Sequence, residues 1–145
     1  MTAQTSAGTS IALSASAPAT YDAVGFAALT FTALGEVTNI GEFGRVYNLV
    51  THNPLATRRT EKYKGSFDDG SLSLDLAVDR TDAGQILAKA ALASDDSYSF
   101  QVTYQDGTID YFSAKTMSFT TNPASVDSIL AGSIAIEVDN DIIEA

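Results

Sequence analysis

The sequence predicts a mainly β protein, an antiparallel sandwich or barrel that carries one α-helix. Three segments alternate apolar and polar residues with the period of a strand: 71–78, 98–104 and 133–138. Asp106-Gly107 supplies the residues of a tight turn inside one apolar run. Only residues 82–93 repeat apolar side chains at helical spacing. These observations together give the predicted fold class.

The first third of the chain has weaker signals. Residues 1–20 are rich in Ser, Thr and Ala, and we interpret them as an N-terminal arm with one short strand near Ser10–Ala15. Residues 16–35 are small and apolar without a clean period, so we expect an extended loop. Segments 36–40 and 45–51 resemble two short strands around a tight turn flanked by glycines.

The middle of the chain holds the clearest strand and the helix. Leucines and a valine recur at every second position of 71–78, as in a half-buried strand. Thr81 or Asp82 can cap the helix, and Gln85 follows Asp82 by three positions, as in a capping box. The predicted apolar face of the helix consists of Ile86, Leu87, Ala90 and Ala91.

The last third predicts a hairpin and two further strands. One face of the first hairpin strand carries Tyr98, Phe100, Val102 and Tyr104. The return strand follows the Asp106-Gly107 turn and leads into a strand over 115–121. The final strand alternates Ile134, Ile136 and Val138 with small or polar residues.

Residues 51–65 differ from the rest of an acidic chain. The formal net charge is -10, yet half of the eight basic residues fall within seven positions of this stretch: Arg58, Arg59, Lys62 and Lys64. The stretch has no clear apolar period. We therefore predict an irregular basic loop over residues 52–66.

Composition limits the classes of function. The 145 residues suit one domain, 1–145, and the absence of cysteine excludes disulfides and thiolate chemistry. No apolar run approaches the roughly 18 residues that span a membrane, and residues 1–20 do not form a secretory signal. The acidity argues against tight binding of nucleic acid phosphates. It favours solubility and would also suit a surface past which DNA moves without adhering, and composition alone does not choose between these two uses.

No catalytic, metal or cofactor site is predicted. His52 has no partner at meaningful spacing, and a histidine without a role is the simpler interpretation. The acidic stretches 67–71 and 139–144 lack the ligand spacing of a calcium loop. Gly41 and Gly44 lack the helix start and lysine of a phosphate-binding loop. We therefore predict a protein that is not an enzyme.

Several predicted strands have one apolar face and one face built from Ser, Thr and Ala. Thr116, Ser118 and Thr120, for example, alternate with Lys115, Met117 and Phe119. The simpler interpretation is a sheet with one solvated face, and the alternative is that the uncharged-to-acidic face lines a channel.

Two segments resemble the tail tube (major tail) proteins of long-tailed, non-contractile bacteriophages. The first is "EKYKGSFDDGSLSLDLAVDRTDAGQILAKAALASDDSYSFQVTY", with its loop, strand, helix of the type GQxxLxxA, and strand. The second is "YQDGTIDYFSAKTMSFTT", which is similar to the family's D-G-T hairpin and following strand. The resemblance covers roughly residues 35–139.

The resemblance implies a structural virion protein. Members of the family form homohexameric rings that stack into a tube, and inner strands close a β barrel through which DNA is ejected into the host. It implies a tail location, assembly in the host cytoplasm, and no membrane. Implied partners are other copies, the tape measure protein, the tail terminator, and baseplate or tail-tip proteins. DNA passes without specific binding, and we expect no additional C-terminal decoration domain.

The resemblance also implies roles for particular residues. Residues 52–66 would be the inter-ring loop, with contacts from Arg58, Arg59, Lys62 and Lys64 to acidic groups of the next ring. Candidate acidic partners are Asp68, Asp69, Asp95, Asp96 and Glu144. Lumen-facing candidates are Thr116, Ser118, Thr120, Ser133, Glu137 and Asp139.

Two alternatives stay open. One is a non-enzymatic β-sandwich module for binding or adhesion, whose basic loop would contact an acidic ligand. The other is the tube protein of a contractile tail or a type VI secretion system, which shares the ring architecture but carries a sheath.

Overall fold

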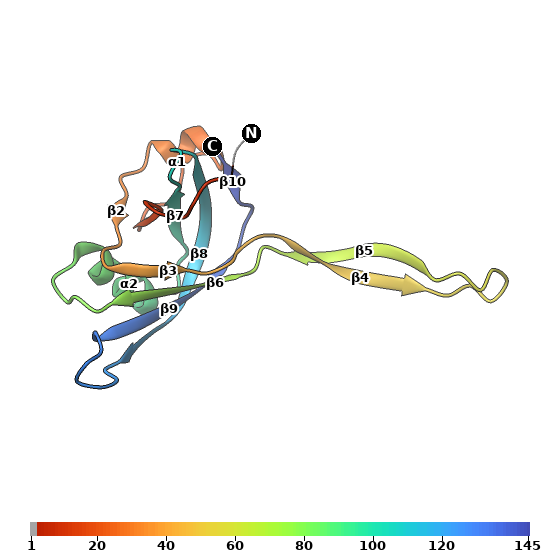
Figure 1. Cartoon of the computed structure of the whole chain (residues 1–145). Coiled ribbons are helices and arrows are strands. Elements are labelled where there is room, and N and C mark those ends of the chain that lie inside the picture. Colours follow the sequence, from red (N-terminus) through yellow and green to blue (C-terminus); the bar gives the residue numbers. More distant parts are fainter. Residues whose placement is uncertain (1–2) are drawn as a thin grey trace.

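A computed structural model describes residues 3–145 and confirms the mainly β, antiparallel fold class (Figure 1). The main body is an eight-stranded sheet, and a separate two-stranded sheet projects from it. In chain order, the elements are β1 (Ser10–Ser14), α1 (Ala23–Ala27), β2 (Thr32–Ala33), β3 (Val37–Ile40), β4 (Val46–His52), β5 (Glu61–Asp68), β6 (Ser71–Ala77), α2 (Ala83–Ala93), β7 (Tyr98–Thr103), β8 (Ile109–Asn122), β9 (Ala131–Val138) and β10 (Ile143–Glu144).

The main sheet runs in the order β2-β1-β7-β8-β9-β6-β3, and β10 adds to β8. Every recorded pairing in it is antiparallel. The sheet bends around one core, to which β1, β6, β7, β8, β9 and α2 all contribute apolar side chains. The alternation predicted for residues 71–78 is confirmed, because Leu72, Leu74 and Leu76 are buried and the residues between them are exposed.

The long strand β8 belongs to both halves of the bent sheet. Its first half pairs with β7 as far as Ala114, and its second half continues alongside β9. The register between β8 and β9 shifts between Thr116 and Ser118, which makes Met117 an extra residue on β8. A β-bulge of this kind bends a strand and exchanges the faces to which later residues point.

Helix α2 confirms the helix predicted for residues 82–93. Asp82 caps it, because its carboxylate accepts a hydrogen bond from the backbone N–H of Gln85 at 3.0 Å. The capping box is incomplete, because the Gln85 amide instead donates to the carbonyls of Ala77 and Gly35. The predicted apolar face is partly wrong: Ala91 is buried, but Ile86 is 54% exposed.

The buried face of α2 consists of Gly84, Gln85, Ala88 and Ala91. Gln85 is buried with all its polar atoms bonded, since its side-chain oxygen accepts from the N–H of Asp79 at 2.9 Å. One polar side chain therefore connects the segment before β3, the end of β6 and the start of α2. Sequence reasoning missed this because glutamine is rarely a core residue.

Asp82→Ala is expected to lower the free energy of unfolding by about 1–2 kcal/mol. The substitution removes the cap and also the acceptor for the N–H of Gly35, which donates to the same carboxylate at 3.0 Å. Asp82→Asn keeps an acceptor oxygen and should lose less. Urea denaturation of the three proteins measures the difference, and equal stability of Asp82→Ala and wild type would contradict it.

Residues 16–35 are not the extended loop that we predicted. They contain α1 and β2, so the chain has two helices in residues 3–145 where the sequence predicted one. Asp22 caps α1 by accepting from the N–H of Gly25 at 2.7 Å. Phe26 is fully buried, with its ring stacked on Tyr111 at 5.2 Å and edge-on to Tyr21 at 5.0 Å. This aromatic packing has no periodic sequence signal, because the stacked Tyr111 ring comes from a segment far away in the chain.

Two other early predictions need correction. The strand near Ser10–Ala15 exists, but β1 lies inside the main sheet between β2 and β7 and not in a separate arm. Residues 1 and 2 of the predicted arm lie outside the described part. The strands predicted at 36–40 and 45–51 also exist, but they do not pair with each other: β3 pairs with β6, and β4 pairs with β5.

Candidate functional site

The segment predicted as an irregular basic loop is mostly a β hairpin that projects from the body (Figure 1). Strands β4 and β5 pair from Val46–Asp68 to His52–Glu61, and only residues 53–60 at the tip lack strand structure. All of β4 and most of β5 are exposed. The sequence of this hairpin has no apolar period because neither of its faces packs against the core.

One face of the hairpin, which we name the basic face, carries Arg45, Tyr47, Lys62, Lys64 and Phe67. Tyr47 and Phe67 form a cross-strand pair with ring centroids 5.3 Å apart. The Arg45 guanidinium lies 4.0 Å from the centroid of the Phe67 ring, and Lys64 Nζ lies 4.8 Å from that of Tyr47. Cations at these distances are attracted to the faces of the rings. The aromatic pair therefore orients positive charge along the ribbon.

The four predicted contact cations all lie on this hairpin. Arg58 and Arg59 are at its tip, and Lys62 and Lys64 are on the exposed strand β5. Within residues 3–145, no carboxylate forms a salt bridge with any of the four. The hairpin thus presents these charges to solvent in a single chain.

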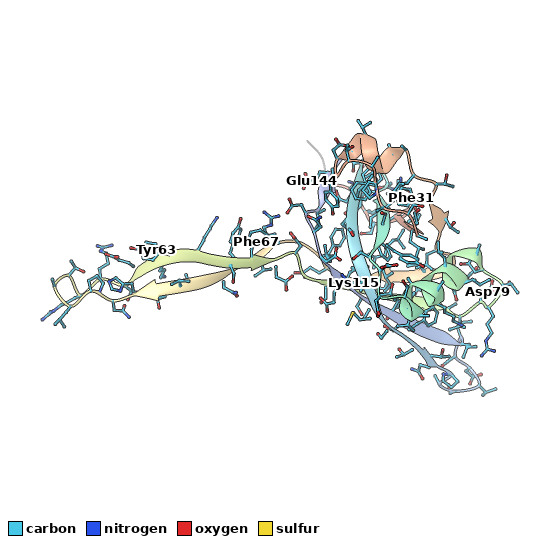
Figure 2. The ribbon with its side chains drawn as sticks, turned by 180° about the vertical axis from the view of Figure 1, so that it is seen from behind. Phe31, Tyr63, Phe67, Asp79, Lys115 and Glu144 are labelled. Carbon is cyan, nitrogen blue, oxygen red and sulfur yellow. The ribbon has the colours of Figure 1, made fainter. Side chains whose placement is uncertain are left out.

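The opposite face of the hairpin also exposes apolar side chains, between polar ones. Val46, Val50 and Tyr63 are 67%, 48% and 54% exposed, and Tyr63 donates a hydrogen bond to Glu61 at 2.7 Å. Figure 2 shows Tyr63 and Phe67 on the projecting ribbon, away from the core. An isolated two-stranded hairpin is marginally stable in water. Apolar exposure on both sides is typical of a surface that another protein covers.

The root of the hairpin is fastened to the body by polar contacts. Arg45 Nε lies 3.1 Å from a carboxylate oxygen of Asp69, and its Nη2 contacts Asp141. Asp69, one of the predicted acidic partners for the next ring, is only 8% exposed and bonds to Arg45 of its own chain. Tyr21 completes the network: its hydroxyl donates to the carbonyl of Asp141 at 2.6 Å and accepts from the N–H of Ser113 at 3.1 Å.

Stability is expected to fall as pH rises through the Tyr21 titration. Burial is the main cause that raises the pKa of Tyr21 from 10.0 to about 12, and nearby aspartates add to it. Since the folded state holds the proton more tightly, the stabilisation is complete below pH 10 and is lost as pH rises towards 12. Urea denaturation across this range should show a smaller pH dependence for Tyr21→Phe. Equal slopes would contradict the prediction.

A second surface is the outward face of the four strands β3, β6, β9 and β8, which we name the hydroxyl face. The strand register places on it Asn39, Ser71, Ser73, Asp75, Lys115, Ser118, Thr120, Ser133, Ala135 and Glu137. Each of these is exposed or half-buried, and five carry hydroxyl groups. The opposite side of the same strands faces the core through residues such as Leu74 and Ile136. This face is therefore a polar, hydroxyl-bearing surface on four continuously paired strands.

The structure places five of the six lumen-facing candidates together. Ser118, Thr120, Ser133 and Glu137 lie on the hydroxyl face, and Asp139 lies at its border. Thr116 does not belong to it, because it pairs with Ile136 and is only 6% exposed. The bulge at Met117 explains the error: an extra residue places Thr116 and Ser118 on opposite faces, although simple alternation predicts one face.

The buried hydroxyl of Thr116 has no hydrogen-bond partner among the described residues. An unsatisfied buried polar group costs about 1–3 kcal/mol. Thr116→Val should therefore raise the free energy of unfolding by about 1 kcal/mol. Thr120→Val, on the exposed face, serves as the matched control and should be nearly neutral. Calorimetric melting compares the three proteins, and a lower melting temperature for Thr116→Val would contradict the expectation.

The one lysine of the hydroxyl face is neutralised at its border. Lys115 Nζ lies 3.1 Å from the Asp139 carboxylate, which also accepts from the Ser97 hydroxyl. Burial is the largest single influence on the pKa of Asp139 and acts to raise it. Hydrogen bonds from Ser97, Lys115 and Ser113 together outweigh burial, so the pKa lies below the ordinary 3.8. Asp139 is thus charged at neutral pH. With Asp75 and Glu137, it leaves the surface uncharged to acidic.

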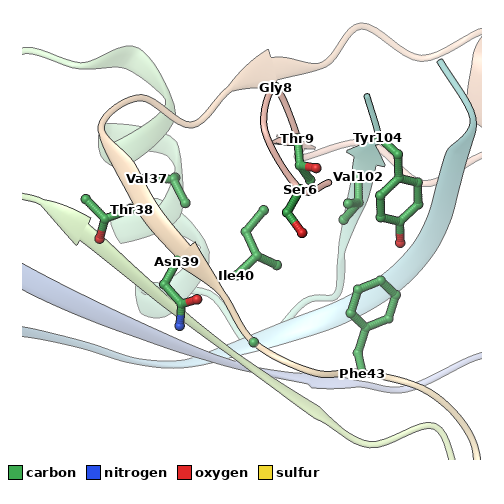
Figure 3. A pocket seen from close by; sticks show the side chains of 11 residues that line it. Ser6, Gly8, Thr9, Val37, Thr38, Asn39, Ile40, Phe43, Val102 and Tyr104 are labelled. Atoms are coloured by element: carbon green, nitrogen blue, oxygen red, sulfur yellow. The ribbon is translucent and has the colours of Figure 1, made fainter. Parts of the chain in front are cut away.

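Both margins of the hydroxyl face are unpaired. Among residues 3–145, β3 pairs only with β6, and the second half of β8 pairs only with β9. A groove of about 390 Å³ borders β3, with walls from residues 6–9, from β3 and from the end of β7 (Figure 3). Ile40, Phe43 and Tyr104 line it, and none of its lining residues is charged. Unpaired edges invite pairing with another strand.

Other candidate sites carry little chemistry. His52 is exposed at the end of β4. Within the described range, no three His, Cys, Asp or Glu side chains lie close enough to hold a metal ion. Neither helix in residues 3–145 is long and apolar enough to cross a membrane.

Comparison with other proteins identifies the fold. No protein-family model and no curated protein matches the chain. Solved structures do match it. One is a chain in the tail of the empty gene transfer agent particle, a structure obtained by helical refinement with C6 symmetry. It superposes with a TM-score of 0.71 at 15% identity, over 97% of both chains.

Two further structures extend this likeness. The SPP1 tail tube gives a TM-score of 0.66 at 15% identity, over 94% of this chain and 75% of that one. A chain in the sheath/tube terminator of the PVC extracellular contractile injection system gives 0.70 at 10% identity, over 100% and 98%. At these identities the likeness concerns the fold. The chain has the tail-tube fold that the resemblance implied.

Proposed function

We propose that this chain is a structural subunit of a tail tube and that it catalyses no reaction. Copies close into hexameric rings, and the rings stack into the tube through which DNA is delivered into the host. The observation that carries the proposal is the hydroxyl face, a four-stranded surface with an unpaired strand edge on each side.

The two edges are suited to each other. Strand β3 is antiparallel to β6, β6 to β9 and β9 to β8, so β3 of one copy continues the antiparallel order when placed beside β8 of the next. Closing a ring in this way pairs both margins of the hydroxyl face, as in a closed barrel. The hydroxyl faces of all copies then form the inner wall. The C6 symmetry of the similar gene transfer agent tail supports six copies.

Charge supports the stacking of rings. Residues 45–68 carry five Lys or Arg and two Asp or Glu, whereas the rest of the chain carries three and sixteen. The hairpin of one copy is therefore complementary to the body of another. Because a hairpin and a body are different surfaces, the contact is heterologous and propagates from copy to copy. Electrostatic complementarity of this kind steers association and fixes register.

The inner wall would suit the passage of DNA. Phosphates adhere to clustered Lys and Arg, and the only cation on the hydroxyl face is paired with Asp139. Weakly acidic, hydroxyl-bearing walls repel phosphates slightly and offer no tight site. The subunit would thus reside in the virion tail after assembly in the host cytoplasm. Its partners would be other copies, the tape measure protein, the tail terminator, and baseplate or tail-tip proteins.

Negative-stain electron microscopy of the purified chain over a concentration series tests the proposal. Hollow tubes or stacked six-fold rings are the expected result. Monomers that persist at every concentration, even after addition of preformed tail tips, would contradict it and favour a binding or adhesion module.

A second candidate is the tube protein of a contractile tail or a type VI secretion system. The likeness to the PVC contractile system favours it, and so does the apolar exposure on α2, where Ile86 is 54% and Leu92 is 40% exposed. A sheath could cover this helix. Micrographs of intact particles separate the two candidates, because a sheath widens the tail outside the tube.

A further inference from the structure

The hairpin meets the body at two glycines that face each other. Gly44 has a φ of +150° and precedes Arg45, whereas Gly70 has a φ of +90° and follows Asp69. A Cβ atom on Gly70 would lie 3.2 Å from the carbonyl oxygen of Gly44. The two chain segments thus pass each other closely without side chains at the root. Glycine restrains the backbone least, so the covalent connection alone fixes the angle of the hairpin poorly.

Contacts of Arg45 cross this root. Its guanidinium stacks on Phe67 of β5 at 4.0 Å, bonds to Asp69 at 3.1 Å, and reaches Asp141 near the C-terminus. Phe67 belongs to the hairpin and Asp141 to the body. One side chain therefore joins both sides of the glycine pair.

The segment around Asp141 is bonded to the main sheet. Tyr21 bonds to the carbonyl of Asp141 and to the N–H of Ser113 on β8. Strand β10 follows at once and pairs with β8 through Ile143–Tyr111. Contact with Asp141 therefore fixes Arg45 relative to the main sheet.

We infer that Arg45 is a positioning residue that latches the hairpin at one angle to the body. Arginine suits this task because its planar group stacks on a ring while its N–H groups bond to carboxylates. The use of the latch rests on the proposed function: a hairpin already held in place presents its basic tip to the next copy with less entropy to lose on docking.

The latch itself is testable in the full-length single subunit. The chain has no cysteine, so Leu55→Cys at the tip and Asp95→Cys beyond α2 give two unique spin-label sites. Double electron–electron resonance should show one narrow distance peak in this labelled protein. Arg45→Gln should lose the narrow peak, whereas Arg80→Gln, an exposed arginine elsewhere, should keep it. A narrow peak retained in Arg45→Gln would overturn the inference.

A double-mutant comparison distinguishes a latch from general loosening. If Arg45 acts through Asp141, Asp141→Asn should broaden the peak, and adding it to Arg45→Gln should broaden the peak no further. Additive broadening would contradict this route. Circular dichroism should show the body still folded in each variant.

Tube formation tests the use of the latch. Arg45→Gln should require a higher protein concentration than wild type before tubes appear, and equal thresholds would show that the latch does not promote assembly. If wild type forms no tubes at all, the proposed function fails, whereas the distance measurement still decides whether the latch exists.

Discussion

Tube formation is expected to be lost when Arg58 and Arg59 are both replaced by glutamate. Both residues lie at the exposed tip of the hairpin and have no ion-pair partner among residues 3–145. Each exposed pair contributes only about 0–1 kcal/mol, but a ring repeats the contact in every subunit. Glutamates at the tip would turn attraction to an acidic body into repulsion. Sedimentation and electron microscopy measure the loss.

Two controls separate this effect from a general change in charge. Arg58→Lys with Arg59→Lys keeps the charge and should keep the tubes. Arg80→Glu with Lys89→Glu makes the same change in charge on the body and should impair assembly less. Higher salt should slow assembly of wild type, because it screens exposed charges. Unimpaired tubes from the Arg58 and Arg59 double glutamate variant would refute the steering role.

DNA ejection is expected to slow or stop when the hydroxyl face is made basic. Ser118→Lys, Thr120→Lys and Ser133→Lys add three cations to each subunit at positions that share this face. In a ring these cations would surround the DNA and hold its phosphates. The rate is measured on particles assembled with the variant, as the increase in fluorescence of a DNA-binding dye when the DNA leaves the particle.

The matched control changes the same three positions to asparagine. Asparagine is polar and uncharged, so ejection should continue near the wild-type rate. Raising the salt concentration should partly restore ejection in the lysine variant, since phosphate contacts weaken with salt. Unchanged ejection kinetics in the lysine variant would show that this face does not line the lumen.

The sequence predicts those parts of the fold in which one face is buried. Strands β6, β7 and β9 and helix α2 were predictable, because burial of one side imposes a period of 2.0 or 3.6 residues. The hairpin was not, because β4 and β5 expose both faces and carry no such period. Helix α1 was missed because Phe26 packs against Tyr111, a residue from a distant segment, so its burial leaves no local period.

Candidate site residues follow the same rule. Charge alone located the four cations of the hairpin, since clustering in sequence needs no fold. Alternation located the hydroxyl face on β8 and β9 but misplaced Thr116, because one bulge residue reverses the faces. The Arg45 contacts could not be predicted, since Asp69 and Asp141 become neighbours of Arg45 only through the fold.

The separation of charge between hairpin and body also gives an assembled stack a direction. In the proposed tube every hairpin points towards the same neighbour, so one end of the stack exposes unoccupied basic hairpins and the other exposes uncovered acidic bodies. A protein that closes the first end needs an acidic docking surface, and one that starts or closes the second end needs a basic one. Growth from the two ends would then differ in rate, and a single capping protein could not block both.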